Sequence, residues 1–229
     1  MITRIIAIRN LEPYIGQDLS LLADSFGITK YKDGKQNKGW KGLTLERLAG
    51  ITNNNKQAPN GLGFELKSVA HYNVKNELRP KETMAITMIN PLILANTEFL
   101  KSHCWEKLKS LIFCAVSWHG KNNLESKLLK VSSFDFIESN TLIKEISDDY
   151  ELIRQKLINY GFQSLTGKDG KWIQARTKGP GHGSTSRAFY ARKSLINEIF
   201  KYLRNRNLSD RNNKSYIKIK HLLVKTCIR

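Results

Sequence analysis

The longest apolar run in the chain, residues 111–116, constrains the fold more than any other feature. A run this short between polar segments predicts a strand that is buried in a sheet. Further strands are predicted at residues 64–69, 83–89 and 171–177. Helices are predicted at residues 42–50, 144–160 and 193–206, where apolar residues recur at helical spacing. We therefore expect an α/β fold with a mixed central β-sheet flanked by helices.

The charge of the chain indicates the class of its partner. Its 38 Lys and Arg residues exceed its 20 Asp and Glu residues, which gives a formal net charge of +18. A domain this basic is typical of proteins that bind a polyanion. Nucleic acid is favoured over an acidic membrane surface, because no basic amphipathic helix stands out. No stretch approaches the run of about 20 apolar residues that spans a membrane.

Cysteine and histidine do not predict a zinc site. The three cysteines, Cys104, Cys114 and Cys227, are odd in number and lack the spacing of metal ligands. The five histidines are not paired in the sequence either. Reduced thiols are typical of a cytoplasmic protein, and residues 1–8 lack the pattern of a signal peptide. We therefore expect a cytoplasmic location.

The tripeptide Glu65-Leu66-Lys67 is the first sign of chemistry. On a strand, Glu65 and Lys67 project from the same face. Metal-dependent cleavage of a phosphodiester needs oxygen ligands for a hard cation and a group that orients or activates water. The Glu65 carboxylate and the Leu66 carbonyl are candidate Mg²⁺ ligands, and Lys67 is a candidate for orienting water. By itself the pattern is more often a solvated strand face with an ion pair, so the surrounding segments decide its meaning.

Five segments, in order within residues 37–205, carry a resemblance to one family. They are GWKGLTLERLAG (39–50), APNGLGFELKS (58–68), SHCWEKLKSLIFCAV (102–116), GKWIQARTK (170–178) and SRAFYARKSLINEIF (186–200). Together they resemble the MutH-like branch of the PD-(D/E)xK nucleases, and they are similar to MvaI/BcnI-type restriction endonucleases and to MutH. The resemblance implies a restriction-endonuclease-like core of MutH type that cleaves DNA with Mg²⁺ as cofactor.

The resemblance also implies a role for each matching residue. Glu46, on the first predicted helix, should organise the site or its metal. Glu65 should be a metal ligand, and Lys67 should serve the attacking water. Lys107 should contact the phosphate or support the catalytic centre.

Asn60 departs from the family pattern, which has an Asp at the start of the motif. MvaI/BcnI-type enzymes carry the Asp at the position of Asn60, whereas MutH carries it two residues earlier, at the position of Ala58. Asn60 is a candidate Mg²⁺ ligand beside Glu65 and Leu66, although an amide is a weaker ligand than the nearly isosteric carboxylate. Two interpretations remain: an inactivated Asp-to-Asn form, or a natural variant with low activity or a different ligand set. As a plain structural feature, Asn60 before Gly61 suits a turn.

The Gly- and Ser-rich loop at 177–187 is the predicted DNA-contacting segment. Such a loop lets backbone amides approach phosphates, and an arginine can read guanine in the major groove. Its composition is also typical of a mobile surface loop. The predicted DNA-binding residues are Arg176, Lys178, His182, Ser184, Ser186, Arg187 and Tyr190.

These features predict a type II restriction endonuclease that uses Mg²⁺ to cut a short specific sequence in double-stranded DNA. The alternatives are a MutH-like mismatch-repair nicking endonuclease and a DNA-binding protein that does not cut. We expect a single nuclease domain over residues 1–229, with a catalytic lobe at about 1–120 and a DNA-recognition lobe at about 121–229. We expect a monomer or weak dimer without an obligate protein partner.

Overall fold

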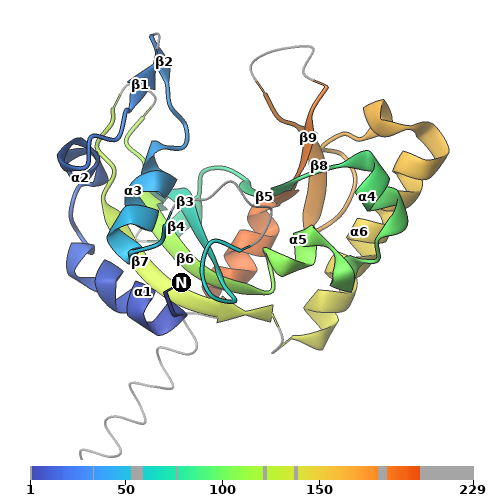
Figure 1. Ribbon diagram of the computed structural model, residues 1–229, viewed down its shortest axis with the longest axis horizontal. Helices are drawn as coiled ribbons and strands as arrows, with labels where there is room; N and C mark the ends of the chain where they lie inside the picture. Colours follow the sequence, from blue (N-terminus) through green and yellow to red (C-terminus); the bar gives the residue numbers. More distant parts are fainter. Residues whose placement is uncertain are drawn as a thin grey trace, which may run out of the picture.

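Two larger β-sheets lie side by side in the computed structural model, with helices on their outer sides (Figure 1). The structure describes residues 2–32, 34–52, 59–75, 77–120, 123–136, 139–179 and 185–201, and the following statements concern these residues. No described helix is long and apolar enough to cross a membrane.

The first sheet has four strands in the order β4-β3-β6-β7. Their bounds are β3 (Glu65–Val74), β4 (Glu77–Pro80), β6 (Ser110–Ser117) and β7 (Leu128–Asp135). β3 and β6 run parallel, while β4 and β7 are antiparallel to their neighbours. β4 pairs only with residues 71–74, so the edge of β3 next to Glu65 has no partner strand in the described chain.

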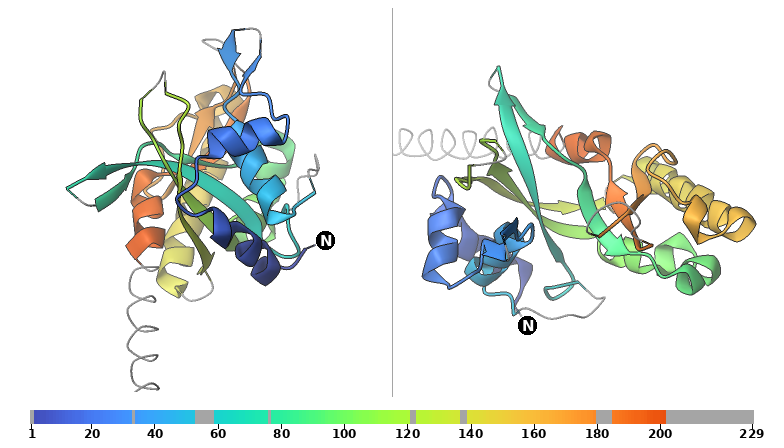
Figure 2. Two further views of the ribbon diagram at one scale, coloured as in Figure 1. Left: turned by 90° about the vertical axis from the view of Figure 1, so that its left-hand side faces the viewer. Right: turned by 90° about the horizontal axis from the view of Figure 1, so that it is seen from above.

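Three helices cover the outer face of this sheet (Figure 2): α1 (Arg4–Leu11), α2 (Leu19–Ser25) and α3 (Trp40–Ala49). α3 ends where the sequence predicts, because Gly50 adopts the left-handed conformation with φ 77°. A small hairpin of β1 (Tyr31–Lys32) and β2 (Lys35–Gln36) precedes α3.

The second sheet has three antiparallel strands in the order β5-β9-β8. These are β5 (Met84–Met88), β8 (Ile173–Thr177) and β9 (Arg187–Ala191). The helices around it are α4 (Pro91–Asn96), α5 (His103–Glu106), α6 (Asn140–Tyr160) and the helical residues 193–201. Short 3-10 turns occur at Glu12–Tyr14, Phe99–Lys101 and Phe162–Ser164.

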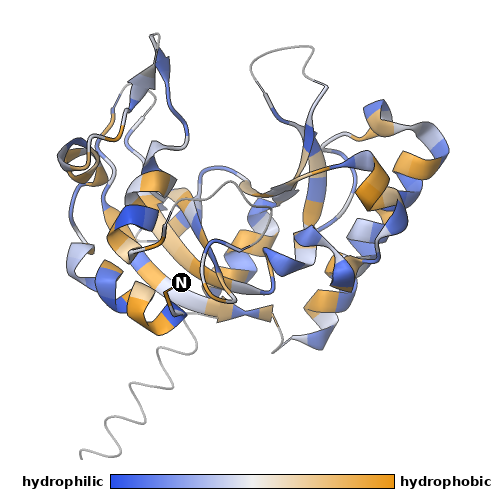
Figure 3. Cartoon of the chain, viewed as in Figure 1, coloured by the Kyte–Doolittle hydropathy of each residue, from blue (hydrophilic) through white to orange (hydrophobic). Residues whose placement is uncertain are grey.

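β6 lies at the centre of the core, as its apolar run predicts (Figure 3). Leu111, Phe113 and Ala115 pack towards the second sheet and α6. Ile112, Cys114 and Val116 pack towards α1, α2 and α3. Because both faces are covered, the strand needs apolar residues at successive positions instead of at alternate ones.

The predicted α/β class with a mixed sheet and flanking helices is confirmed. The strands do not divide between the sheets at residue 120, however. β5 comes from the first half of the chain but belongs to the second sheet, and β7 comes from the second half but belongs to the first. Local sequence pattern does not predict the place of β5, because it depends on long-range pairing with β9, whereas β7 pairs with the preceding strand β6.

Candidate active site

A tight turn at residues 60–64 directly precedes β3. The Gly61 N–H donates to the Phe64 carbonyl at 3.0 Å, and Gly63 has a φ of 73°, which favours glycine. A Cβ on Gly61 would lie 2.1 Å from the Phe64 ring, so no larger residue fits there without a shift. The turn thereby holds Asn60 beside Glu65, the first residue of the strand.

Asn60 makes three hydrogen bonds at the site, and two of them go to the candidate acids Glu46 and Glu65. Its Nδ2 donates to Glu46 Oε1 at 2.8 Å, and its Oδ1 accepts from the Leu66 N–H at 2.9 Å. Its backbone N–H donates to Glu65 Oε2 at 2.9 Å. This geometry assigns the amide orientation, because only the nitrogen can donate to Glu46.

Glu65 is almost fully buried, with 3% of its side chain exposed, and two lysines balance its charge. Lys67 Nζ lies 2.8 Å and Lys107 Nζ lies 3.3 Å from Glu65 Oε1. Lys67 also donates to the Ile86 carbonyl at 3.2 Å. Burial lowers the pKa of Lys67, against the raising effect of Glu65. A buried carboxylate with charged, movable partners is typical of a functional site.

Glu46 comes from α3 and completes the cluster. Burial raises the pKa of its carboxyl group, and the charge of Glu65 raises it further, while the hydrogen bond from Asn60 has the opposite effect. Glu46, Asn60, Glu65, Lys67 and Lys107 therefore meet from α3, the 60–64 turn, β3 and the end of α5. All five are predicted site residues, and the structure brings them together.

The oxygen atoms of this cluster suit a hard cation such as Mg²⁺. The Leu66 N–H points to the Asn60 side of β3, and the N–H and C=O of one strand residue point to the same side. The Leu66 carbonyl therefore points to the Asn60 side of β3 as well. No group of three His, Cys, Asp or Glu residues that could hold a metal occurs in the described chain. Asn60 stands where a third acid would complete such a group.

Arg176 and Tyr190 form a paired surface on the neighbouring strands β8 and β9. The Arg176 guanidinium lies 5.4 Å from the centre of the Tyr190 ring and donates to Thr83 Oγ1 at 3.0 Å. These contacts hold an exposed cation in a fixed orientation, which suits phosphate or base contact. Whether the pair contacts DNA stays a prediction.

The predicted DNA-contacting loop begins and ends close to the cluster. The charge of Lys178 acts on Lys67, whose pKa it lowers slightly. The Lys178 N–H donates to the carbonyl of Ser186, which is exposed. His182 and Ser184 lie outside the described residues.

The structure places Arg187 differently from the expected DNA contact. Its side chain is buried and donates to the Leu165 carbonyl at 3.0 Å and to Gln163 Oε1 at 2.9 Å. Its guanidinium also lies over the Phe162 ring. These contacts fit a role in fastening residues 162–165 to β9. Sequence position alone did not reveal the burial.

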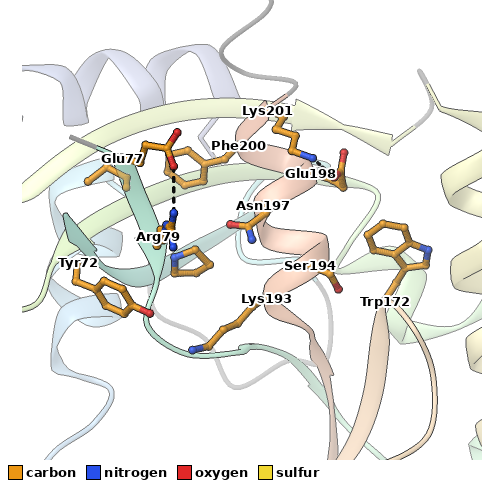
Figure 4. A pocket seen from close by; sticks show the side chains of 12 residues that line it. Tyr72, Glu77, Arg79, Trp172, Lys193, Ser194, Asn197, Glu198, Phe200 and Lys201 are labelled. Atoms are coloured by element: carbon orange, nitrogen blue, oxygen red, sulfur yellow. Dashed lines mark hydrogen bonds and ion pairs between the residues drawn. The ribbon is translucent and has the colours of Figure 1, made fainter. Parts of the chain in front are cut away.

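The Ile86 carbonyl, which is the second acceptor for Lys67, was not predicted from the sequence. A backbone group has no residue signature, so no sequence signal identifies it. A hollow of about 570 Å³ lies elsewhere, between the β3–β4 hairpin and residues 193–201 (Figure 4). Tyr72, Arg79 and Lys193 line it, and none of the candidate site residues does. The chemistry of the side chains, not the size of the hollow, identifies the candidate site.

Comparisons with known proteins agree with this geometry. The family model described as "DNA mismatch repair enzyme MutH" matches residues 49–152, which include Asn60, Glu65, Lys67 and Lys107. The chain is similar to the DNA mismatch repair protein MutH of Haemophilus influenzae, with 24% identity over 79% of this chain and 86% of the relative. The MutH proteins of Escherichia coli and Salmonella paratyphi C are 24% and 27% identical, over 79% of this chain and 78% of each relative. Through this family model and these distant relatives, the chain is similar to the MutH family of PD-(D/E)xK nucleases.

Proposed function

We propose that this chain is a type II restriction endonuclease. It hydrolyses phosphodiester bonds in a short specific sequence of double-stranded DNA, with Mg²⁺ and without an obligate protein partner. The observation that carries the proposal is the hydrogen-bonded cluster of Glu46, Asn60, Glu65, Lys67 and Lys107 at the unpaired edge of β3. The net charge of +18 supports a DNA substrate.

Glu46, Glu65 and the Leu66 carbonyl would hold the metal. When bound, Mg²⁺ would stabilise the negative charge that develops on the reacting phosphate and lower the pKa of the attacking water. Lys67 orients that water or a phosphate oxygen. Its ammonium has three hydrogens, of which Glu65 and the Ile86 carbonyl accept two, so the third is directed to the reactants. Lys107 neutralises charge on the phosphate.

Asn60 makes this chain a weakly active form. With Asn at this position, two acids face two lysines, so the cluster is balanced without a cation. An Asp would add one negative charge about as far from Glu46 as the 2.8 Å that now separates Asn60 Nδ2 from Glu46 Oε1. A metal ion would relieve that repulsion, which is the reason why an acid at this position favours Mg²⁺ binding.

The test is the Asn60→Asp variant on supercoiled plasmid DNA. We expect Mg²⁺-dependent cleavage to rise by about 100-fold or more, because a carboxylate is a much better Mg²⁺ ligand than an amide. In EDTA the variant should unfold at lower temperature than the parent, and Mg²⁺ should reverse the difference. Asn60→Ala is the control, since it removes the amide without adding charge. Intact plasmid across a broad panel of sequences would overturn the nuclease proposal for this chain.

A mismatch-repair nicking endonuclease is the second candidate, because the relatives named above are MutH proteins. The same Asn60→Asp protein separates the two. Cleavage of both strands of an unmethylated duplex by the purified chain supports a restriction enzyme. Nicking of one strand at hemimethylated sites, only with added partner proteins, supports repair. Salt-sensitive DNA binding without any cleavage would leave the third candidate, a DNA-binding protein.

A further inference from the structure

β5 contains a β-bulge at Ile86. Its pairing with β9 joins Ala85 to Tyr190 and Thr87 to Phe189, so Ile86 is an extra residue without a partner on β9. A bulge of this kind takes one residue out of the ladder and changes the direction of its backbone groups. Bulges are over-represented next to active sites for this reason.

The freed carbonyl of Ile86 accepts a hydrogen bond from Lys67 Nζ at 3.2 Å. The contact crosses from the first sheet to the second. β4 runs antiparallel along β3, and the chain then leaves β3 and continues as β5 of the other sheet (Figure 2). Lys67 therefore lies where the two sheets separate, and the Ile86 carbonyl of the second sheet accepts a hydrogen bond from its ammonium.

We propose that the bulge at Ile86 is a positioning element that makes the orientation of Lys67 depend on the second sheet. The proposal rests on the proposed function for the role of Lys67 in cleavage. The Ile86 carbonyl holds one hydrogen of the ammonium and Glu65 holds another. Movement of β5 relative to β3 redirects the third hydrogen, towards or away from the reacting phosphate.

The path from this bulge to the predicted DNA-contacting surface is short. Tyr190 pairs with Ala85, the residue directly before the bulge, and its ring supports the Arg176 guanidinium. A DNA contact at Arg176 would therefore act on β9 next to Ile86. Such a link would allow the lysine to reach its working orientation only when DNA is seated on both sheets.

The first experiment measures the hydrogen bond without any activity. The carbonyl ¹³C resonance of Ile86 is recorded in the parent, in Lys67→Met and in Lys107→Met. We expect Lys67→Met to shift it and Lys107→Met to leave it unchanged, because Lys67 donates to this carbonyl and Lys107 donates to Glu65 instead. An equal resonance in the parent and Lys67→Met would overturn the proposal. Since this readout does not need cleavage, it decides the inference even if the nuclease proposal fails.

The second experiment removes the bulge by deleting Ile86 in the Asn60→Asp protein. Ile86→Val is the matched control, because it alters the side chain and keeps the carbonyl. We expect the deletion to lower the single-turnover cleavage rate of plasmid DNA by about 10- to 100-fold, the effect of losing one charged hydrogen bond, with plasmid affinity within about twofold. Parallel loss of affinity and rate, or an unchanged rate, contradicts the proposal. If the deletion does not fold, the carbonyl resonance gives the decision.

Discussion

Two buried carboxylates in this protein have similar exposure and very different surroundings. Glu65 is 3% exposed and Asp149, on α6, is 7% exposed. Asp149 accepts from the backbone N–H groups of Lys171, Trp172 and Ile173, at 2.6–2.9 Å. It thereby holds the start of β8 against α6. Glu65 instead accepts mainly from two lysine side chains, and from a single backbone N–H, that of Asn60.

The type of partner, not the burial, separates structure from function here. Backbone donors are fixed by the fold, so they satisfy Asp149 permanently and leave it nothing further to bind. Lysine side chains can move, so they can leave Glu65 and bind a phosphate or a water instead. A carboxylate with such partners can take up a metal when the reactants arrive. The comparison predicts that changes near Glu65 affect the reaction, and that changes at Asp149 affect stability.

The largest expected effect is at Lys67. In the Asn60→Asp protein, Lys67→Ala should lower the cleavage rate by about 100- to 10,000-fold, because a group that orients or activates the attacking water is lost. Plasmid affinity should change little. Single-turnover cleavage and filter binding measure the two quantities, and Lys109→Ala is the control. An equal loss of cleavage rate and plasmid affinity would make Lys67 a binding residue. It would also contradict the prediction that changes near Glu65 act on the reaction.

Asp149→Ala should have its main effect on stability. We expect the free energy of unfolding to fall by roughly 3 kcal/mol, since three buried backbone N–H groups lose a charged acceptor. Urea denaturation measures the change, and the exposed neighbour Asp148 supplies the control Asp148→Ala. Cleavage per folded molecule should be unchanged. A difference of less than about 0.5 kcal/mol between the variants would show that the backbone bonds contribute little.

Arg176→Ala tests the surface of β8 that Asp149 helps to position. We expect DNA affinity to fall by about 3- to 10-fold, because one phosphate contact is lost. For the same reason the slope of log affinity against log salt concentration should become shallower by about one. Binding at several salt concentrations measures both. Arg79, which lies on β4 at the hollow of Figure 4, is the matched control. The same loss in Arg79→Ala would indicate a general effect of net charge.

The smallest expected effect concerns His71, a buried group with only one hydrogen bond. Its Nδ1 lies 2.8 Å from the Val69 carbonyl, and no described residue is a partner for its Nε2. Burial lowers the pKa of His71, so the folded protein binds fewer protons than the unfolded chain. The contribution of neutral His71 to stability is therefore fully present above the pKa of the unfolded chain, about 6.5. It is lost as the pH falls from there towards the lower pKa of His71 in the folded protein.

Thermal unfolding at pH 7, 6 and 5 measures this effect. His71→Leu should show a smaller drop in melting temperature over this range than the parent. His103→Leu, at an exposed position, should keep the drop of the parent. If His71→Leu keeps the full drop, another group is responsible for the acid sensitivity.

Local pattern was sufficient to predict much of the secondary structure. The apolar run at 111–116, the spacing in residues 144–160 and the terminal Gly50 all indicated elements that the structure contains. The end of the helix predicted at residues 193–206 lies outside the described residues. β7 was not predicted because its apolar and polar residues alternate weakly, and the β1–β2 hairpin was not predicted because each of its strands has only two residues.

The sequence by itself determined which residue types stand at the site, because Glu46, Asn60, Glu65, Lys67 and Lys107 belong to segments with the family pattern. Only the tertiary structure decided their distances and partners. It joined Asn60 to Glu46 and Leu66, buried Arg187, and turned the Ile86 carbonyl towards Lys67. The physical reason is range: periodicity and turn chemistry act over a few residues, whereas the charge balance at Glu65 depends on groups up to 42 positions apart.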